Sequence, residues 1–200
     1  MVTITDYKSD SIVDDDNLAP SAFMEMADQI QDNSYGQFVF DRYNAINAWA
    51  TKPTLGTAGT NTKIGIISFQ NAAVPVETFS PVKVPDTFKE DANITLELFA
   101  YSTTASNDVM IEISILGVAP TESVDPAPSY IALPAITMPA STSTYVKTTV
   151  TLTPAQHGLA RGDLLYLTIK REGTAAGDTH TGVYVLVHAV ITYAKGELDV

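Results

Sequence analysis

The sequence predicts a mainly-β protein, a jelly-roll-like β-sandwich of about eight to nine antiparallel strands with an N-terminal arm that contains one short helix. Three observations support this fold class. The 200 residues include 25 Thr, 17 Val and 15 Ile, whose β-branched side chains suit a pleated sheet. Several segments alternate apolar and polar residues with a period of two. Eleven Gly and eleven Pro, spread along the chain, supply turns between many short strands.

We divide the chain into an arm over residues 1–36 and a sandwich domain over residues 37–200. The arm is acidic and polar, and then carries apolar residues at three- and four-residue spacing behind Ser21, which can cap a helix. This amphipathic face packs either on its own domain or on a capsid or neighbouring subunit. Its candidate partner-binding residues are Phe23, Met26, Ala27 and Ile30.

The first strands of the domain are predicted over residues 37–43 and 63–69, which are apolar, β-branched or aromatic and flanked by turn formers. Residues 51–61 between them have the composition of a loop. Residues 74–76 and 81–85 contain prolines, which cannot donate to a central ladder. These two segments are therefore expected at sheet edges or in connections.

The clearest alternation covers residues 94–101, whose even positions share an apolar face that we expect in the core. Residues 109–115 repeat the pattern after turn-forming residues, so the two segments are predicted to form a hairpin. Residues 119–143 hold five prolines and are expected to be a long surface connection with one edge strand.

Three more strands complete the domain. Residues 145–153 alternate, whereas residues 163–171 and 182–193 are apolar at nearly every position, which indicates coverage on both faces. In a two-layer β protein, a second covered face is typical of contact with another subunit. The candidate interface residues are Tyr166, Tyr184, Leu186 and His188.

Composition excludes several classes of partner and chemistry. A formal net charge of -12 has the wrong sign for binding a phosphate backbone, so no nucleic-acid partner is expected. The absence of Cys removes thiol nucleophiles and Cys-bound zinc. The chain has neither a secretory signal pattern nor eighteen consecutive apolar residues, so no membrane partner is expected.

No motif for catalysis is present, and we expect no enzyme activity, no metal and no cofactor. The three His are not spaced as metal ligands. The residues from Asp14 to Asn17 offer oxygen ligands for Ca²⁺ but fit a solvated acidic segment better. The triplet from Arg161 to Asp163 matches an adhesion signal but fits a turn that opens a strand. Trp49 is a candidate for stacking on a sugar ring, with a core or interface role as the alternative.

The run from Ala160 to Arg171, the loop at Gly177-Asp178-Thr179 and the last strand over 183–193 resemble the end of β-sandwich modules in virion proteins of tailed bacteriophages. Trp49, Ser68-Phe69 and Val84-Pro85-Asp86 extend the likeness over about residues 45–193. The resemblance implies a jelly-roll structural protein of the decoration, cement, head-fibre or tail-appendage kind, and it implies no catalytic residues.

Three functions follow, in order of preference. The first is a capsid decoration or cement protein on the virion surface, made in the host cytoplasm, that binds and stabilises the shell of the major capsid protein as a homotrimer. The alternative is a receptor- or glycan-binding module of a fibre or tail appendage. A glycan-cleaving enzyme is a minor alternative, favoured only by the number of carboxylates.

Overall fold

The structure is a computed structural model, and it describes residues 35–46, 51–58, 63–71, 74–102, 104, 107–123, 125, 127–139 and 144–196. These residues belong almost entirely to one compact unit, Gly36–Val200. The predicted arm helix, with Phe23, Met26, Ala27 and Ile30, and the predicted sugar-stacking residue Trp49 lie outside the described residues.

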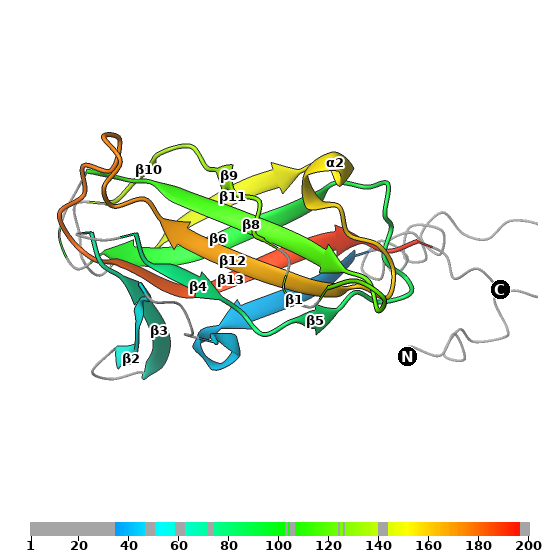
Figure 1. Ribbon diagram of the computed structural model, residues 1–200. Coiled ribbons are helices and arrows are strands. Elements are labelled where there is room, and N and C mark those ends of the chain that lie inside the picture. Colours follow the sequence, from blue (N-terminus) through cyan, green and yellow to red (C-terminus); the bar gives the residue numbers. More distant parts are fainter. Residues whose placement is uncertain are drawn as a thin grey trace, which may run out of the picture. The chain divides into compact units, whose positions relative to one another are not determined.

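The predicted mainly-β sandwich is confirmed. Within the described residues the strands form two main antiparallel sheets, and Figure 1 shows β8 and β12 of one sheet in front of β6 and β13 of the other. The six-stranded sheet has the order β11-β6-β13-β3-β2, with β1 also paired to β13. Its members are β1 (Tyr35–Asp41), β2 (Thr54–Ala58), β3 (Ile64–Phe69), β6 (Ile94–Ser102), β11 (Val146–Leu152) and β13 (Tyr184–Ala194).

The five-stranded sheet has the order β4-β12-β8-β9, with β5 also paired to β12. Its members are β4 (Val76–Thr78), β5 (Val82–Lys83), β8 (Ile111–Val118), β9 (Ile131–Ala132) and β12 (Leu164–Arg171). A further small sheet joins β7 (Asp108–Val109) to β10 (Ile136–Thr137). The described residues also contain the 3-10 helix η3 (Arg42–Asn44) and the one-turn helix α2 (Pro154–His157).

The core lies between the two main sheets, where each strand turns its apolar alternate residues inward. Ile94, Leu96 and Leu98 of β6 are buried, and so are Ile113 of β8 and Leu167 of β12 from the opposite sheet. This agrees with the face predicted from the even positions of residues 94–101. Removal of this apolar surface from water is the main favourable contribution to folding.

The predicted hairpin between residues 94–101 and 109–115 is wrong. Strand β6 lies between β11 and β13, whereas β8 lies between β12 and β9 in the other sheet. The two strands turn their apolar faces toward a shared core from opposite sides. Alternation specifies which face of a strand is buried, but it does not specify the neighbouring strand.

The prediction of a loop over residues 51–61 is also wrong in part, because Thr54–Ala58 pairs along its whole length with β3. An edge strand has only one ladder, so a Thr- and Gly-containing segment is sufficient there. The edge placement of residues 74–76 and 81–85 is confirmed, since β4 and β5 both pair with the side of β12 away from β8.

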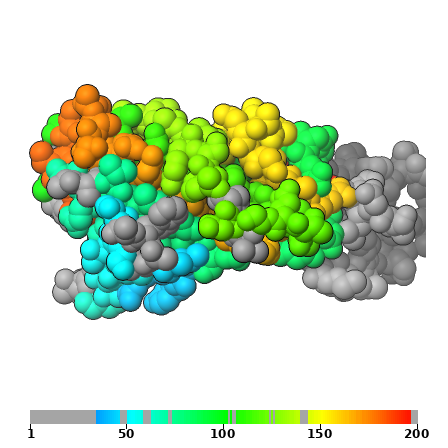
Figure 2. Space-filling view, in the orientation of Figure 1, coloured from blue at the N-terminus to red at the C-terminus, as the bar shows by residue number. Residues whose placement is uncertain are grey.

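The long proline-rich connection covers the outer face of the five-stranded sheet. The Tyr130 ring centroid lies 4.1 Å from Lys170 Nζ, and the Ser129 backbone N–H donates to Ser114 Oγ at 3.1 Å. In Figure 2 the yellow-green atoms of this segment spread over the face on which Figure 1 shows β8 and β12. The chain therefore covers part of this second face itself.

Candidate functional site

Aromatic side chains cross the outer face of the six-stranded sheet. On β6 the residues between the buried even positions, including Phe99 and Tyr101, point away from the core. The Tyr101 ring meets Tyr145 edge-on, with centroids 5.7 Å apart, and the Phe99 ring stacks on His188 at 4.4 Å and 25°. Tyr145 is 53% exposed. We call these four residues, Tyr145, Tyr101, Phe99 and His188, the aromatic strip.

A β-bulge directs His188 to this face. Leu186 pairs with Ala100 and His188 with Phe99, so Val187 is an extra residue in β13. Consequently Leu186 and Ala189 are both buried, while Val187 and His188 lie half-buried between them on the outer side. A bulge of this kind leaves one residue unpaired and changes which face the following residues occupy.

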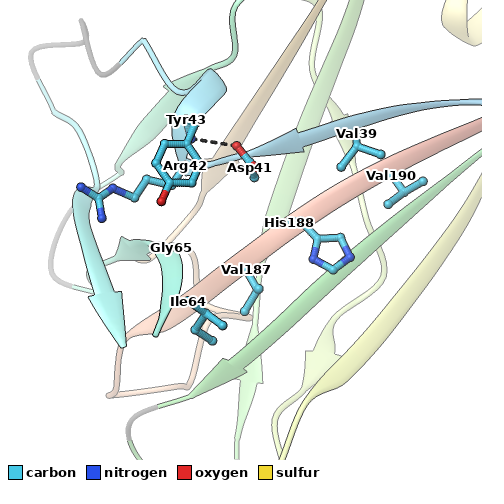
Figure 3. A pocket seen from close by; sticks show the side chains of 9 residues that line it. All are labelled: Val39, Asp41, Arg42, Tyr43, Ile64, Gly65, Val187, His188 and Val190. Carbon is cyan, nitrogen blue, oxygen red and sulfur yellow. Dashed lines mark hydrogen bonds between the residues drawn. The ribbon is translucent and has the colours of Figure 1, made fainter. Parts of the chain in front are cut away.

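A groove of about 320 Å³ continues the aromatic strip toward the sheet edge. It lies on the side of β13 opposite β6, where β1 and β3 both pair with β13. Figure 3 shows His188 in the groove, with Val39 and Val190 on one side and Val187 and Ile64 on the other. The full lining is Val39, Asp41, Arg42, Tyr43, Ile64, Gly65, Val187, His188 and Val190.

Helix η3 closes one end of the groove. The Tyr43 backbone N–H donates to Asp41 Oδ1 at 2.8 Å, and the Asp41 N–H donates to Asn44 Oδ1 at 3.1 Å, which together form a capping box. Arg42 Nη1 donates to the Gly56 carbonyl oxygen at 2.7 Å and so attaches η3 to β2. These bonds present the Tyr43 ring to solvent with 80% of the residue exposed.

Gly65 permits the close approach of η3 to β3. A Cβ atom at this position would lie 3.2 Å from Arg42 Cβ, closer than ordinary van der Waals contact. Because Gly65 also lines the groove, a side chain there would press on η3 and narrow the space.

The polar groups around the aromatic strip are largely paired with each other. Lys147 Nζ lies 2.7 Å from Glu97 Oε1, across the β11–β6 ladder beside Phe99. Gln37 Nε2 donates to Thr192 Oγ1 at 3.3 Å on the same face. Burial raises the pKa of Tyr101, and the nearby Tyr145 phenol raises it further, so the Tyr101 hydroxyl is neutral and able to donate at physiological pH.

The predicted interface residues lie in three different environments. Tyr184 and Leu186 are fully buried in the core of this chain, so their assignment to a subunit surface is wrong. The bulge explains the error, because it divides β13 into two stretches. Even-numbered residues face the core before the bulge, and His188, also even-numbered, faces the outer side after it. Tyr166 is half-buried on the outer side of β12, and His188 is half-buried in the groove. A subunit contact at Tyr166 or His188 stays a prediction.

The triplet from Arg161 to Asp163 forms the turn that the sequence predicts. Arg161 Nε donates to the Phe88 carbonyl oxygen at 2.9 Å, and Gly162 has a φ of +83°. Asp163 is 7% exposed, and its Oδ2 accepts the Ala160 N–H at 2.9 Å. Both charged side chains, those of Arg161 and Asp163, are held against the domain. The loop therefore does not present them as an adhesion signal would.

Two kinds of feature are absent from the part of the chain that the structure describes. No group of three or more His, Asp or Glu side chains there is arranged to hold a metal ion. None of the helices in the same ranges has the length and apolar character needed to cross a lipid bilayer.

The aromatic strip has a partial signal in the sequence. Phe99 and Tyr101 occupy the odd positions of the strand predicted over residues 94–101, where an outer face usually carries polar residues. Two aromatic residues on that face indicate a surface with a binding role. The pairing with Tyr145 and His188 depends on strand order and on the bulge, so it has no local signal.

No family model matches the sequence, and no curated protein matches it. Among solved structures, the CBM22-1 xylan-binding domain from Paenibacillus barcinonensis is similar with a TM-score of 0.47 and 8% identity, covering 80% of this chain and 94% of that domain. The CBM22-2 xylan-binding domain from the same organism has a TM-score of 0.46 and 12% identity, covering 78% of this chain and 98% of that domain.

The enzymatically active domain of tailspike protein 4 of bacteriophage CBA120 is similar with a TM-score of 0.38 and 10% identity. The match covers 81% of this chain and 19% of that one. None of these three structures is a capsid protein. These similarities assign no role to this chain.

Proposed function

We propose that this chain is a glycan-binding β-sandwich module that works without catalysis, as in a fibre or tail appendage. The observation that carries this proposal is the aromatic strip and the groove it enters, on the outer face of the six-stranded sheet. Aromatic faces match the apolar faces of sugar rings, and the neighbouring Thr, Gln and Tyr side chains can bond sugar hydroxyls. The proposal rests on these side chains and not on the similarity of fold.

The rigidity of the site supports a binding role. Apart from Tyr145, which precedes β11, its residues lie on strands and on a capped 3-10 helix. The Phe99 ring stacks on His188, and the Tyr101 ring meets Tyr145 edge-on. Side chains that are already ordered lose little conformational entropy when a ligand binds. An apolar surface of this type also occupies a position where a solvent-facing sheet usually carries polar residues.

Capsid decoration stays an untested prediction of the sequence. The arm residues assigned to the major capsid protein lie outside the described residues, and no feature of the described surface favours that partner or a homotrimer. The same holds for placement on the virion surface. The aromatic strip is instead a specific observation in favour of glycan binding.

A glycan array with the purified full chain tests the proposal, followed by calorimetry on the best hit. Phe99→Ala removes the ring on which His188 stacks, and Tyr145→Ala removes the exposed end of the strip. Each variant is expected to weaken binding by about tenfold or more, which corresponds to about 1.4 kcal/mol.

Tyr166→Ala is the matched control, because Tyr166 lies on the outer side of β12 in the opposite sheet. It is expected to leave glycan affinity unchanged. Circular dichroism and thermal unfolding would establish that all three variants keep the fold. A silent array, or equal affinity loss in the strip variants and the control, contradicts the proposal.

A further inference from the structure

We infer that the ligand of the aromatic strip is an uncharged, extended glycan chain that lies across the strands. This inference rests on the proposed function and adds to it the charge class and the minimum length of the ligand. It is carried by the charge balance of the site, by the net charge of the protein, and by the number of strands that the strip crosses.

The charged groups at the site balance one another. Lys147 and Glu97 form a 2.7 Å ion pair beside Phe99. At the groove, Arg42 donates to the Gly56 carbonyl oxygen, and Asp41 accepts the Tyr43 N–H. The strip and groove thus carry two cations and two carboxylates, with no excess of positive charge for a uronate, sialate or sulfate group. Recognition of an anionic sugar typically uses unpaired Arg or Lys donors.

The charge of the whole chain acts in the same direction. A formal net charge of -12 produces a negative potential around the protein, which repels a polyanionic polysaccharide as it approaches. An uncharged polysaccharide experiences no such repulsion. Ring stacking and hydroxyl hydrogen bonds are then sufficient for its recognition, and both depend little on ionic strength.

The strip is longer than one sugar ring. Tyr145 precedes β11, Tyr101 and Phe99 lie on β6, and His188 lies on β13, beyond which the groove reaches β1. Three steps between neighbouring strands correspond to roughly 14 Å. The two aromatic pairs lie on opposite sides of β6, one toward β11 and one toward β13, so they offer separate platforms. A ligand that contacts both pairs must cross the strands obliquely, because Tyr101 and Phe99 lie two residues apart along β6.

The experiment is affinity titration of the full chain with two panels of polysaccharides. The neutral panel is mixed-linkage β-glucan, galactomannan and dextran, and the acidic panel is polygalacturonate, alginate and hyaluronan. We expect binding to at least one neutral polysaccharide, with affinity that changes less than about twofold between about 0.05 and about 0.5 M NaCl. Acidic polysaccharides are expected to bind at least about tenfold more weakly.

A charge variant tests directly whether the balance of cations and carboxylates at the site disfavours acidic ligands. Glu97→Gln keeps the size of the side chain but leaves Lys147 without its carboxylate partner. This variant is expected to bind the acidic panel more tightly than the wild-type chain does, in a salt-sensitive manner. Size-fractionated fragments of the neutral ligand are expected to bind more tightly with length until the strip is filled.

The outcomes separate this inference from the proposed function. Preference for acidic polysaccharides, weakened by salt, overturns the uncharged class while glycan binding stands. Equal affinity for a disaccharide and a long chain overturns the extended mode. Absence of binding to both panels overturns the proposed function and this inference with it.

Discussion

A single buried guanidinium connects the two sheets at one end of the sandwich. Arg171, at the end of β12, is fully buried and binds both oxygens of Asp178, through Nε at 2.9 Å and Nη2 at 2.8 Å. Its other bonds go to the carbonyl oxygens of Phe69, His180 and Gly182, at 3.0, 2.6 and 2.7 Å. Since Phe69 ends β3, the Arg171 side chain reaches from one sheet to the other. Only a planar guanidinium supplies donors in this arrangement.

Replacement of Arg171 by Met is expected to lower the free energy of unfolding by about 3–5 kcal/mol, because the Asp178 carboxylate would be buried without a cation. Arg171→Lys is not expected to restore it, since one ammonium cannot bind a carboxylate and three carbonyls together. Urea denaturation monitored by circular dichroism measures the change. Lys83→Met removes an exposed ion pair with Asp86 and is the control, with an expected change below about 0.5 kcal/mol. A loss below 1 kcal/mol for Arg171→Met would contradict a stabilising role.

At the scale of elements, the bulge in β13 determines the site. Without Val187, the strand would alternate regularly from Tyr184 to Tyr193, with Leu186 and Ala189 in the core and His188 on the outer face between them. The extra residue therefore does not serve the core. It widens the outer face at the point where β1 and β3 separate, and it contributes to the floor of the groove.

Deletion of Val187 is consequently expected to be tolerated by the fold but not by the site. The pairs Leu186–Ala100 and His188–Phe99 become consecutive in a regular ladder, so the free energy of unfolding should change by no more than about 2 kcal/mol. The groove loses one lining residue, and glycan affinity should fall about tenfold or more. Denaturation and calorimetry on the same preparation measure both quantities.

Deletion of Ile191 from the same strand is the matched control. Every residue after the deletion would change faces, which moves Tyr193 out of the core. This variant is expected to fold poorly or to lose several kcal/mol of stability. If the two deletions destabilise the protein equally, the bulge contributes to the fold and not specifically to the site.

The same elements show how much the sequence predicts. Alternation over residues 94–101 identified the buried face of β6 correctly, because a period of two depends only on neighbouring residues. Prolines identified β4 and β5 as edge segments for an equally local reason. The sequence also contains the signals of α2, since Thr153, Gln156 and Gly158 provide a capping box and a left-handed C-cap.

Features that depend on distant residues could not be predicted in this way. The placement of β6 and β8 in different sheets follows from the packing of the whole core, and the bulge follows from the register of β13 against β6. His188 is therefore flanked by apolar residues in the sequence but lies on the outer face of the sheet. The aromatic strip joins residues up to 89 positions apart, from Phe99 to His188, so its components are visible in the sequence only as separate aromatic residues.

At the scale of the whole molecule, charge is unevenly distributed. Residues 1–34 contain eight Asp and Glu against one Lys, and thus hold -7 of the net charge of -12. The remaining sequence has ten Lys and Arg against fifteen Asp and Glu. The sandwich domain is therefore only moderately acidic. The dependence of its stability on alkaline pH has a specific cause, which is the burial of tyrosines.

Burial of tyrosines is expected to limit stability at high pH. Tyr184 is fully buried, its hydroxyl has no hydrogen-bond partner among the described residues, and burial raises its pKa. Burial also raises the pKa of Tyr193. A raised pKa means that the folded state holds the proton after the unfolded chain has released it. The stabilisation is complete below about pH 10, the pKa of an unfolded tyrosine, and is lost as the pH rises further.

Tyr184→Phe should therefore flatten the alkaline decline of the unfolding free energy by about 1.4 kcal/mol per pH unit above pH 10. It should also raise stability at neutral pH by about 1 kcal/mol, because an unpaired hydroxyl leaves the core. Urea denaturation at a series of pH values measures both effects. Tyr43→Phe, which removes an exposed phenol, controls for loss of a hydroxyl group as such. Parallel alkaline slopes for wild type and Tyr184→Phe would show that Tyr184 ionises as readily in the folded protein as in the unfolded chain.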